Sequence, residues 1–159
     1  MSDYQIHEVV ATLVAIFLLL SPLLSLLAAQ TIRSGAWHLP SGLARIGVPA
    51  AHAFAWAPIA CIASFASLVL RIRLEAGEWP RAGVEPPDSW TWLVHGSVTA
   101  ILFLIAVVSV VPLFDLGVLL AAAGRKLRFH EWIAFAAGYV LLWTLMTLDP
   151  GRFLSWFWD

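Results

Sequence analysis

Cysteine and charged residues are scarce in this chain of 159 residues. It has one cysteine, Cys61, and only 12% of its residues are charged. A single cysteine excludes an internal disulfide, a cysteine-based zinc site and iron–sulfur ligation by this chain alone. The basic and acidic residues nearly balance to a net charge of -1, with no long basic run. We therefore expect no nucleic-acid partner.

Signatures of catalysis are also missing. The sequence contains no G-x-S-x-G motif and no phosphate-binding glycine loop. The serines in its apolar segments have no histidine one turn away along the same helix: Ser21, Ser25, Ser64 and Ser67. We expect that the chain is not catalytic on its own.

The first apolar segment lacks the basic leader of a signal peptide. Its leader, MSDYQIHE, carries acidic residues where a signal peptide has Lys or Arg. The apolar stretch that follows is also longer than the core of such a peptide. This segment is expected to be a membrane helix.

Apolar sequence is what the chain has in abundance. It is 61% hydrophobic, with a mean hydropathy of +0.86. Four uncharged runs cover about residues 9–30, 46–70, 89–114 and 132–148, and about 17 to 25 helical residues cross a bilayer core of roughly 30 Å. The links between the runs are short and polar. The sequence therefore predicts an all-α fold, with residues 1–159 forming one transmembrane domain, an integral membrane antiparallel four-helix bundle.

Prolines and capping residues predict where the helices begin and end. Pro49 suits the first turn of the second helix, Asp88 or Ser89 caps the third, and the sequence DPG at Asp149 ends the fourth. The third run continues past Asp115 as weakly apolar sequence. It forms either one long tilted helix, which we favour, or a helix broken at Pro112 with residues 116–124 along the membrane interface.

Small residues predict which helix packs at the centre, and tryptophans predict which residues lie at the membrane interface. About half of the second run is Ala, Ser or Cys, which allows close helix approach in a membrane and favours a central position for this helix. Tryptophans near the run ends are typical of an interfacial aromatic belt: Trp37, Trp79, Trp90, Trp92, Trp132, Trp156 and Trp158.

The distribution of basic residues predicts orientation. The side opposite the N-terminus holds Arg33, Arg45, Arg125, Lys126 and Arg128; the N-terminal side holds Arg71, Arg73, Arg81 and Arg152. Basic residues near span ends favour the cytoplasm. We therefore expect a bacterial inner-membrane protein with both termini on the periplasmic side.

Four histidines near span ends are the candidate cofactor ligands. The expected topology places His7 and His95 in one leaflet, and His52 and His130 in the other. Imidazoles from two neighbouring helices can hold a b-type haem iron from both faces. The small residues Ala134 and Gly138 leave space on the same helix face as His130, enough to admit a porphyrin ring. We predict His52 and His130 as the metal-binding pair, with Glu131 supporting the helix N-terminus.

Other assignments of these histidines stay open. A histidine near a membrane interface can simply donate one hydrogen bond. Asp115, Glu131 and His38 lie on the same expected side and could bind a metal without porphyrin. The spans hold no acidic or basic residue at mid-membrane, which argues against a coupled transporter.

One segment resembles a known family. The sequence HEWIAFAAGYVLLW, from His130 to Trp143, resembles the ligand-bearing helix of bacterial membrane b-type cytochromes, subunits that accept electrons from hydrogenases or oxidise quinol. It lacks the Leu-Gly that commonly follows and the Arg before the terminal Trp. The resemblance covers only this segment and implies that His130 is a haem ligand.

These patterns predict a small membrane subunit or anchor of an electron-transfer complex, of respiratory or photosynthetic type. It could hold haem b and contact quinone, lipid and partner membrane or redox subunits. The alternatives are a structural or assembly protein without a cofactor, for which the Ala-rich second helix supplies the contact face, and a small transporter or channel.

Overall fold

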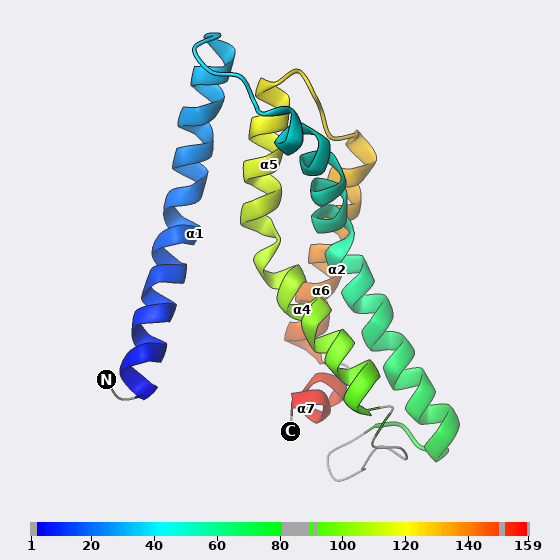
Figure 1. The fold of residues 1–159 in the computed structure, drawn as a ribbon. Helices are drawn as coiled ribbons and strands as arrows, with labels where there is room; N and C mark the ends of the chain where they lie inside the picture. The colour runs from blue at the N-terminus through cyan, green and yellow to red at the C-terminus, as the bar shows by residue number, and fades with distance from the viewer. Residues whose placement is uncertain (1–2, 81–89, 91, 150–151, 159) are drawn as a thin grey trace. The chain divides into compact units, whose positions relative to one another are not determined.

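The fold is entirely helical over the residues that the structure, a computed structural model, describes. These are residues 3–80, 90, 92–149 and 152–158, with side chains left undescribed at 3–11, 13, 14, 44, 155, 156 and 158. The elements in chain order are α1 (Asp3–Arg33), α2 (Ser41–Ala76), the π-helix η1 (Trp92–Gly96), α4 (Ser97–Val108), α5 (Val110–Ala122), α6 (Phe129–Leu148) and α7 (Phe153–Trp158) (Figure 1). The predicted all-α class is confirmed.

The helices also have the length and composition of membrane spans. Three of them, in α1, α2 and α6, are long and apolar enough to cross a bilayer, and η1 and α4 together with α5 would make a fourth if they form one broken span. The membrane character predicted from composition is therefore supported by the helices themselves. The arrangement of the spans as a four-helix bundle stays a prediction.

Contacts divide the chain into two compact units. One comprises Met1–His52 and Val110–Leu127, and the other Ala53–Ser109 and Arg128–Asp159. The boundary falls within α2, which is one continuous helix. The prediction of a single transmembrane domain stays a prediction.

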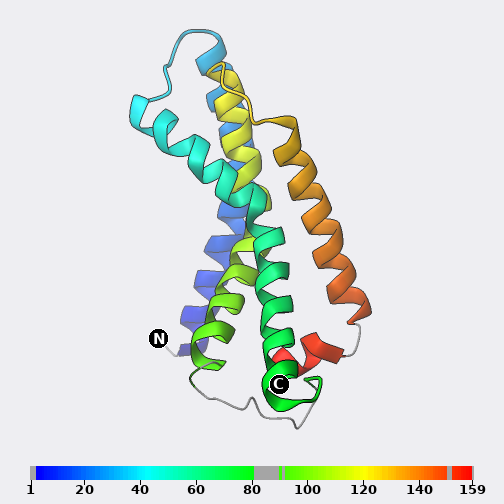
Figure 2. The ribbon, with the colours of Figure 1, turned by 90° about the vertical axis from the view of Figure 1, so that its right-hand side faces the viewer.

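The first unit is built on a parallel pair of helices. α1 packs against α5, and both helices run in the same direction (Figures 1 and 2). The buried positions of α1 recur every fourth residue and are small: Ser21, Ser25 and Ala29. Small residues at this spacing let helix backbones approach where lipid gives no hydrophobic driving force. Leucines such as Leu19 and Leu23 are exposed on α1, as expected for a lipid-facing surface.

The second unit packs α2, α4 and α6 around a common core. Cys61, Ala106 and Leu142, one from each helix, meet in one buried cluster. A second cluster is formed by α2 and α7 and is joined by Trp92 of η1. α4 runs antiparallel to α6 (Figure 2). The chain thus closes one end of a three-helix unit with a short C-terminal helix.

The helix α7 has no counterpart among the predicted spans. Leu154 and Phe157 are buried in the second core cluster, where the Phe157 ring meets Phe65 edge-on, with 5.7 Å between centroids. Trp92, predicted as an interfacial anchor, also packs its ring against Phe157, at 5.5 Å. An aromatic residue at a span end can join the core when another helix covers it.

Two predicted boundaries are wrong. α2 begins at Ser41, so Pro49 lies inside it and not in its first turn. Arg45 directly precedes the uncharged run, but the helix begins before it. The favoured long third helix is interrupted at Ser109. Pro112 lacks the N–H that the Val108 carbonyl would accept in a continuous helix. Asp149 does end α6, in a left-handed conformation, whereas Asp88 and Ser89 lie outside the described residues.

Candidate functional site

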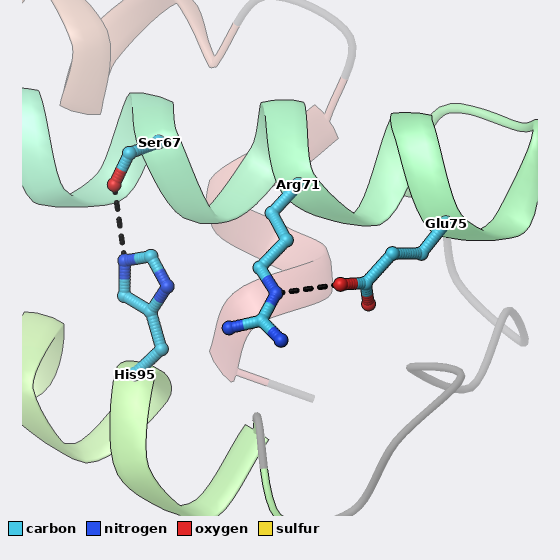
Figure 3. A network of polar contacts seen from close by, with 4 residues as sticks. All are labelled: Ser67, Arg71, Glu75 and His95. Atoms are coloured by element: carbon cyan, nitrogen blue, oxygen red, sulfur yellow. Dashed lines mark hydrogen bonds and ion pairs between the residues drawn. The ribbon is translucent and has the colours of Figure 1, made fainter.

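A polar cluster joins α2 to η1 and α4 at one end of the second unit. The Nε2 atom of His95 lies 3.0 Å from the Ser67 hydroxyl oxygen and 3.2 Å from the Ser64 carbonyl oxygen (Figure 3). The Ser64 and Thr99 hydroxyl oxygens are 2.7 Å apart, and Thr99 donates to the His95 carbonyl at 2.9 Å. Four polar residues therefore link α2 with η1 and α4.

The placement of protons in this cluster follows from its acceptors. The Ser67 hydroxyl donates to the Ser64 carbonyl at 2.8 Å. A carbonyl can only accept, so the approach of His95 Nε2 to the same carbonyl requires an Nε2–H. The hydroxyl oxygen of Ser67 then accepts from His95 and does not pass it a proton. The pair therefore acts as an interhelical clamp and does not form an activated serine nucleophile.

The Ser67–His95 contact is one that the sequence did not predict. No histidine lies one turn from Ser67 along α2, but the fold brings His95 to it from η1. The π-helical turn Trp92–Gly96 widens the backbone at His95, a feature often found at functional sites. Only the pairing of two helices brings these residues together, and no local sequence signal predicts it.

A charged pair continues the same face of α2. The Nε atom of Arg71 donates to Glu75 Oε1 at 2.7 Å, with both side chains substantially exposed. Ser67, Arg71 and Glu75 are spaced four residues apart, so they lie one above another on the helix. Figure 3 shows all three extending toward the side of α2 where His95 lies.

His130 lies at the beginning of α6 with its side chain 60% exposed. Its Nε2 is 4.0 Å from Glu131 Oε1. Glu131, by contrast, is 1% exposed and accepts a hydrogen bond from the backbone N–H of Arg128 at 2.9 Å. This is the helix N-terminal position predicted for Glu131, where its charge is favourable to the helix dipole.

The small-residue face of α6 below His130 is partly occupied by α2. A Cβ atom on Gly138 would lie 2.9 Å from Pro58 Cβ, 3.0 Å from Ile59 Cγ1 and 3.2 Å from the Ile59 backbone nitrogen. Ala134 is also buried. The expectation that this face leaves space for a porphyrin ring is therefore wrong at Gly138, because Pro58 and Ile59 of α2 fill that space.

The remaining predicted ligands are distributed along the chain. His52 is half-buried in α2 and belongs to the first unit, whereas His130 belongs to the second. His38 is exposed in the link before α2. His7 lies in α1, but its side chain is outside the described residues. The pairing of His52 with His130 stays a prediction.

A non-haem metal site was the open alternative, with Asp115, Glu131 and His38 as its candidate ligands. Across residues 3–80, 90, 92–149 and 152–158, no three His, Cys, Asp or Glu side chains are grouped to hold a metal ion. Asp115 lies within α5, a helix that continues past the end of the predicted third run. A charged residue inside a span is expensive and marks a position of interest.

Comparison with known proteins gives no match: no family model, no curated protein and no solved structure is similar to this chain.

Proposed function

We propose that this protein is a small integral membrane subunit that works by assembling with a partner membrane protein. The observation that carries this proposal is the outward face of α2. Alanines that are exposed there recur at alternating spacings of three and four residues together with Trp56: Ala53, Ala60 and Ala63. Lipid-facing surfaces are usually large and apolar, as on α1, whereas exposed small residues allow another helix to approach closely.

The assembly proposal predicts the effect of filling this face. Ala63→Leu should abolish most of the high-mass complex that the wild-type protein forms in mildly solubilised membranes, because the longer side chain holds the partner helix away. The measurement is the apparent mass on native gels. Ala136→Leu, on an exposed position of α6, is the matched control and should leave the complex intact. Equal behaviour of the two variants would contradict the proposal.

The proposed architecture in the membrane has four spans, with α4 and α5 together forming the third. An even number of spans puts both termini on one side, and the basic residues around Arg125 and Lys126 favour the cytoplasm for the opposite side. We propose a bacterial inner-membrane protein with periplasmic termini. Reporters fused at either end should both score periplasmic. Opposite scores for the two ends would contradict the even number.

Electron transfer with haem b is the second candidate function. In its favour, α2 and α6, the helices that carry His52 and His130, pack directly against each other at Gly138. The proposed ligands are His52 and His130, and quinone is the proposed redox partner of such a subunit.

An absorption spectrum tests the haem candidate. A purified haem protein should show a Soret band and a reduced-minus-oxidised α band, and both His52→Ala and His130→Ala should remove them. His38→Ala, at an exposed position outside the helices, serves as the control. A stable but colourless preparation from cells supplied with haem would reject this candidate and leave the assembly proposal standing.

A further inference from the structure

The polar face of α2 lies where the apolar part of the helix ends. The uncharged run closes at Leu70, and Arg71 is the next residue. Trp79, which follows shortly after α2, is 53% exposed, and exposed tryptophans are typical of the lipid headgroup level. Arg71 therefore lies at the depth of lipid phosphates in the proposed membrane arrangement.

Arg71 is held in a defined position. Glu75 accepts the Nε–H of its guanidinium at 2.7 Å. A guanidinium has five N–H donors, so its two terminal amino groups carry four more. Figure 3 shows these amino groups turned away from α2, on the side where the His95 ring lies. A fixed guanidinium with both amino groups presented together matches the geometry of a phosphate.

His95 supplies a second nitrogen on the same side. Its Nε2–H points at Ser64 and Ser67 of α2, which fixes the ring. The other ring nitrogen, Nδ1, then lies on the side of the ring that faces Arg71 (Figure 3). An anion beside Nδ1 favours the imidazolium form, in which both ring nitrogens donate, so it would receive a hydrogen bond from His95 as well as from Arg71.

We propose that Arg71 and His95 together bind a phosphate group, supplied either by a phospholipid headgroup or by a soluble phosphate. The Ser64–Ser67–His95 clamp positions the imidazole, and Glu75 positions the guanidinium. The depth of this site rests on the proposed membrane arrangement, but phosphate binding there needs neither a partner protein nor haem.

Thermal unfolding of the full chain in detergent tests the proposal with three additions. Phosphatidylglycerol supplies phosphate on a lipid, diacylglycerol supplies the same chains without phosphate, and inorganic phosphate supplies the anion alone. At a concentration a hundredfold above its Kd, a bound ligand should raise the Tm by about 5 °C. A gain with phosphatidylglycerol only identifies the lipid as the source, and a gain with inorganic phosphate identifies a soluble phosphate.

Variants of the two nitrogen donors complete the test. Arg71→Gln should weaken binding by about tenfold or more, because a charge-assisted contact is lost. His95→Gln keeps an amide donor that can reach the Ser64 carbonyl but loses Nδ1, so it should weaken binding without lowering the Tm of the ligand-free protein. Arg73→Gln is the matched control, since the Arg73 guanidinium lies over the Trp79 ring, 5.5 Å from its centroid, and it should bind as the wild type does.

Several results would overturn the proposal. These are a Tm that no phosphate-bearing addition raises, a gain that diacylglycerol gives equally, and a gain that Arg71→Gln retains in full. Loss of binding in Arg73→Gln to the same degree as in Arg71→Gln would also reject it, because it would show a general attraction to basic residues at the membrane surface.

Discussion

Gly138→Leu should destabilise the protein by about 3 kcal/mol, the largest effect that we expect from a single substitution. Even a Cβ atom at this position would meet Pro58 at 2.9 Å and the backbone nitrogen of Ile59 at 3.2 Å. Pro58 cannot change its backbone freely, because its ring fixes φ. α2 and α6 would therefore have to separate along their contact, and their shared core would lose packing.

Unfolding of the purified protein by a denaturing detergent measures this effect. Ala137→Leu is the matched control: the neighbouring residue on α6 is exposed, so the same side chain should change the free energy of unfolding by less than about 0.5 kcal/mol. Gly138→Ala should fall between the two. A Gly138→Leu variant as stable as Ala137→Leu would show that α2 and α6 do not pack here.

Composition and helix signals predicted the secondary structure well. Uncharged runs identified the helices because a bilayer leaves few other ways to satisfy the backbone, and Asp149 marked the end of α6. The same signals failed where a charged residue lies inside a helix. Arg45 marks the start of an apolar run but lies inside α2, and Asp115 marks the end of one but lies inside α5. In α1, α2 and α6 the uncharged run is shorter than the helix that contains it.

The sequence predicted only part of the candidate site. His95 was selected because a histidine inside an apolar run is costly, and the structure gives it partners in Ser64 and Ser67. Those partners lie on another helix, and nothing in a single sequence predicts the rotation of two helices about their axes. The small-residue face of α6 around Gly138 illustrates the same limit. Gly138 leaves room on its own helix, but Pro58 and Ile59 occupy that room.

The break between α4 and α5 gives the second large prediction. The Ser109 hydroxyl donates to the Ala106 carbonyl at 2.7 Å. The Tyr139 hydroxyl, from α6, is 2.6 Å from the same carbonyl and 3.0 Å from that of Val107. Carbonyls at an interrupted helix need such donors, because no water reaches them inside a bilayer. The Ser109 and Tyr139 hydroxyls thus both bond to the Ala106 carbonyl, and either one can partly replace the other.

We therefore expect the two substitutions to be non-additive. Tyr139→Phe and Ser109→Ala should each destabilise the protein by about 0.6 kcal/mol, the average for a hydrogen bond between membrane helices. The double variant should lose about 2 kcal/mol, because the Ala106 carbonyl then lacks both side-chain donors. Thr144→Val is the control, since its hydroxyl donates to the Val140 carbonyl of its own exposed helix face at 2.7 Å. If the double variant loses only the sum of the single losses, the two hydroxyls act independently and the break is held by backbone packing alone.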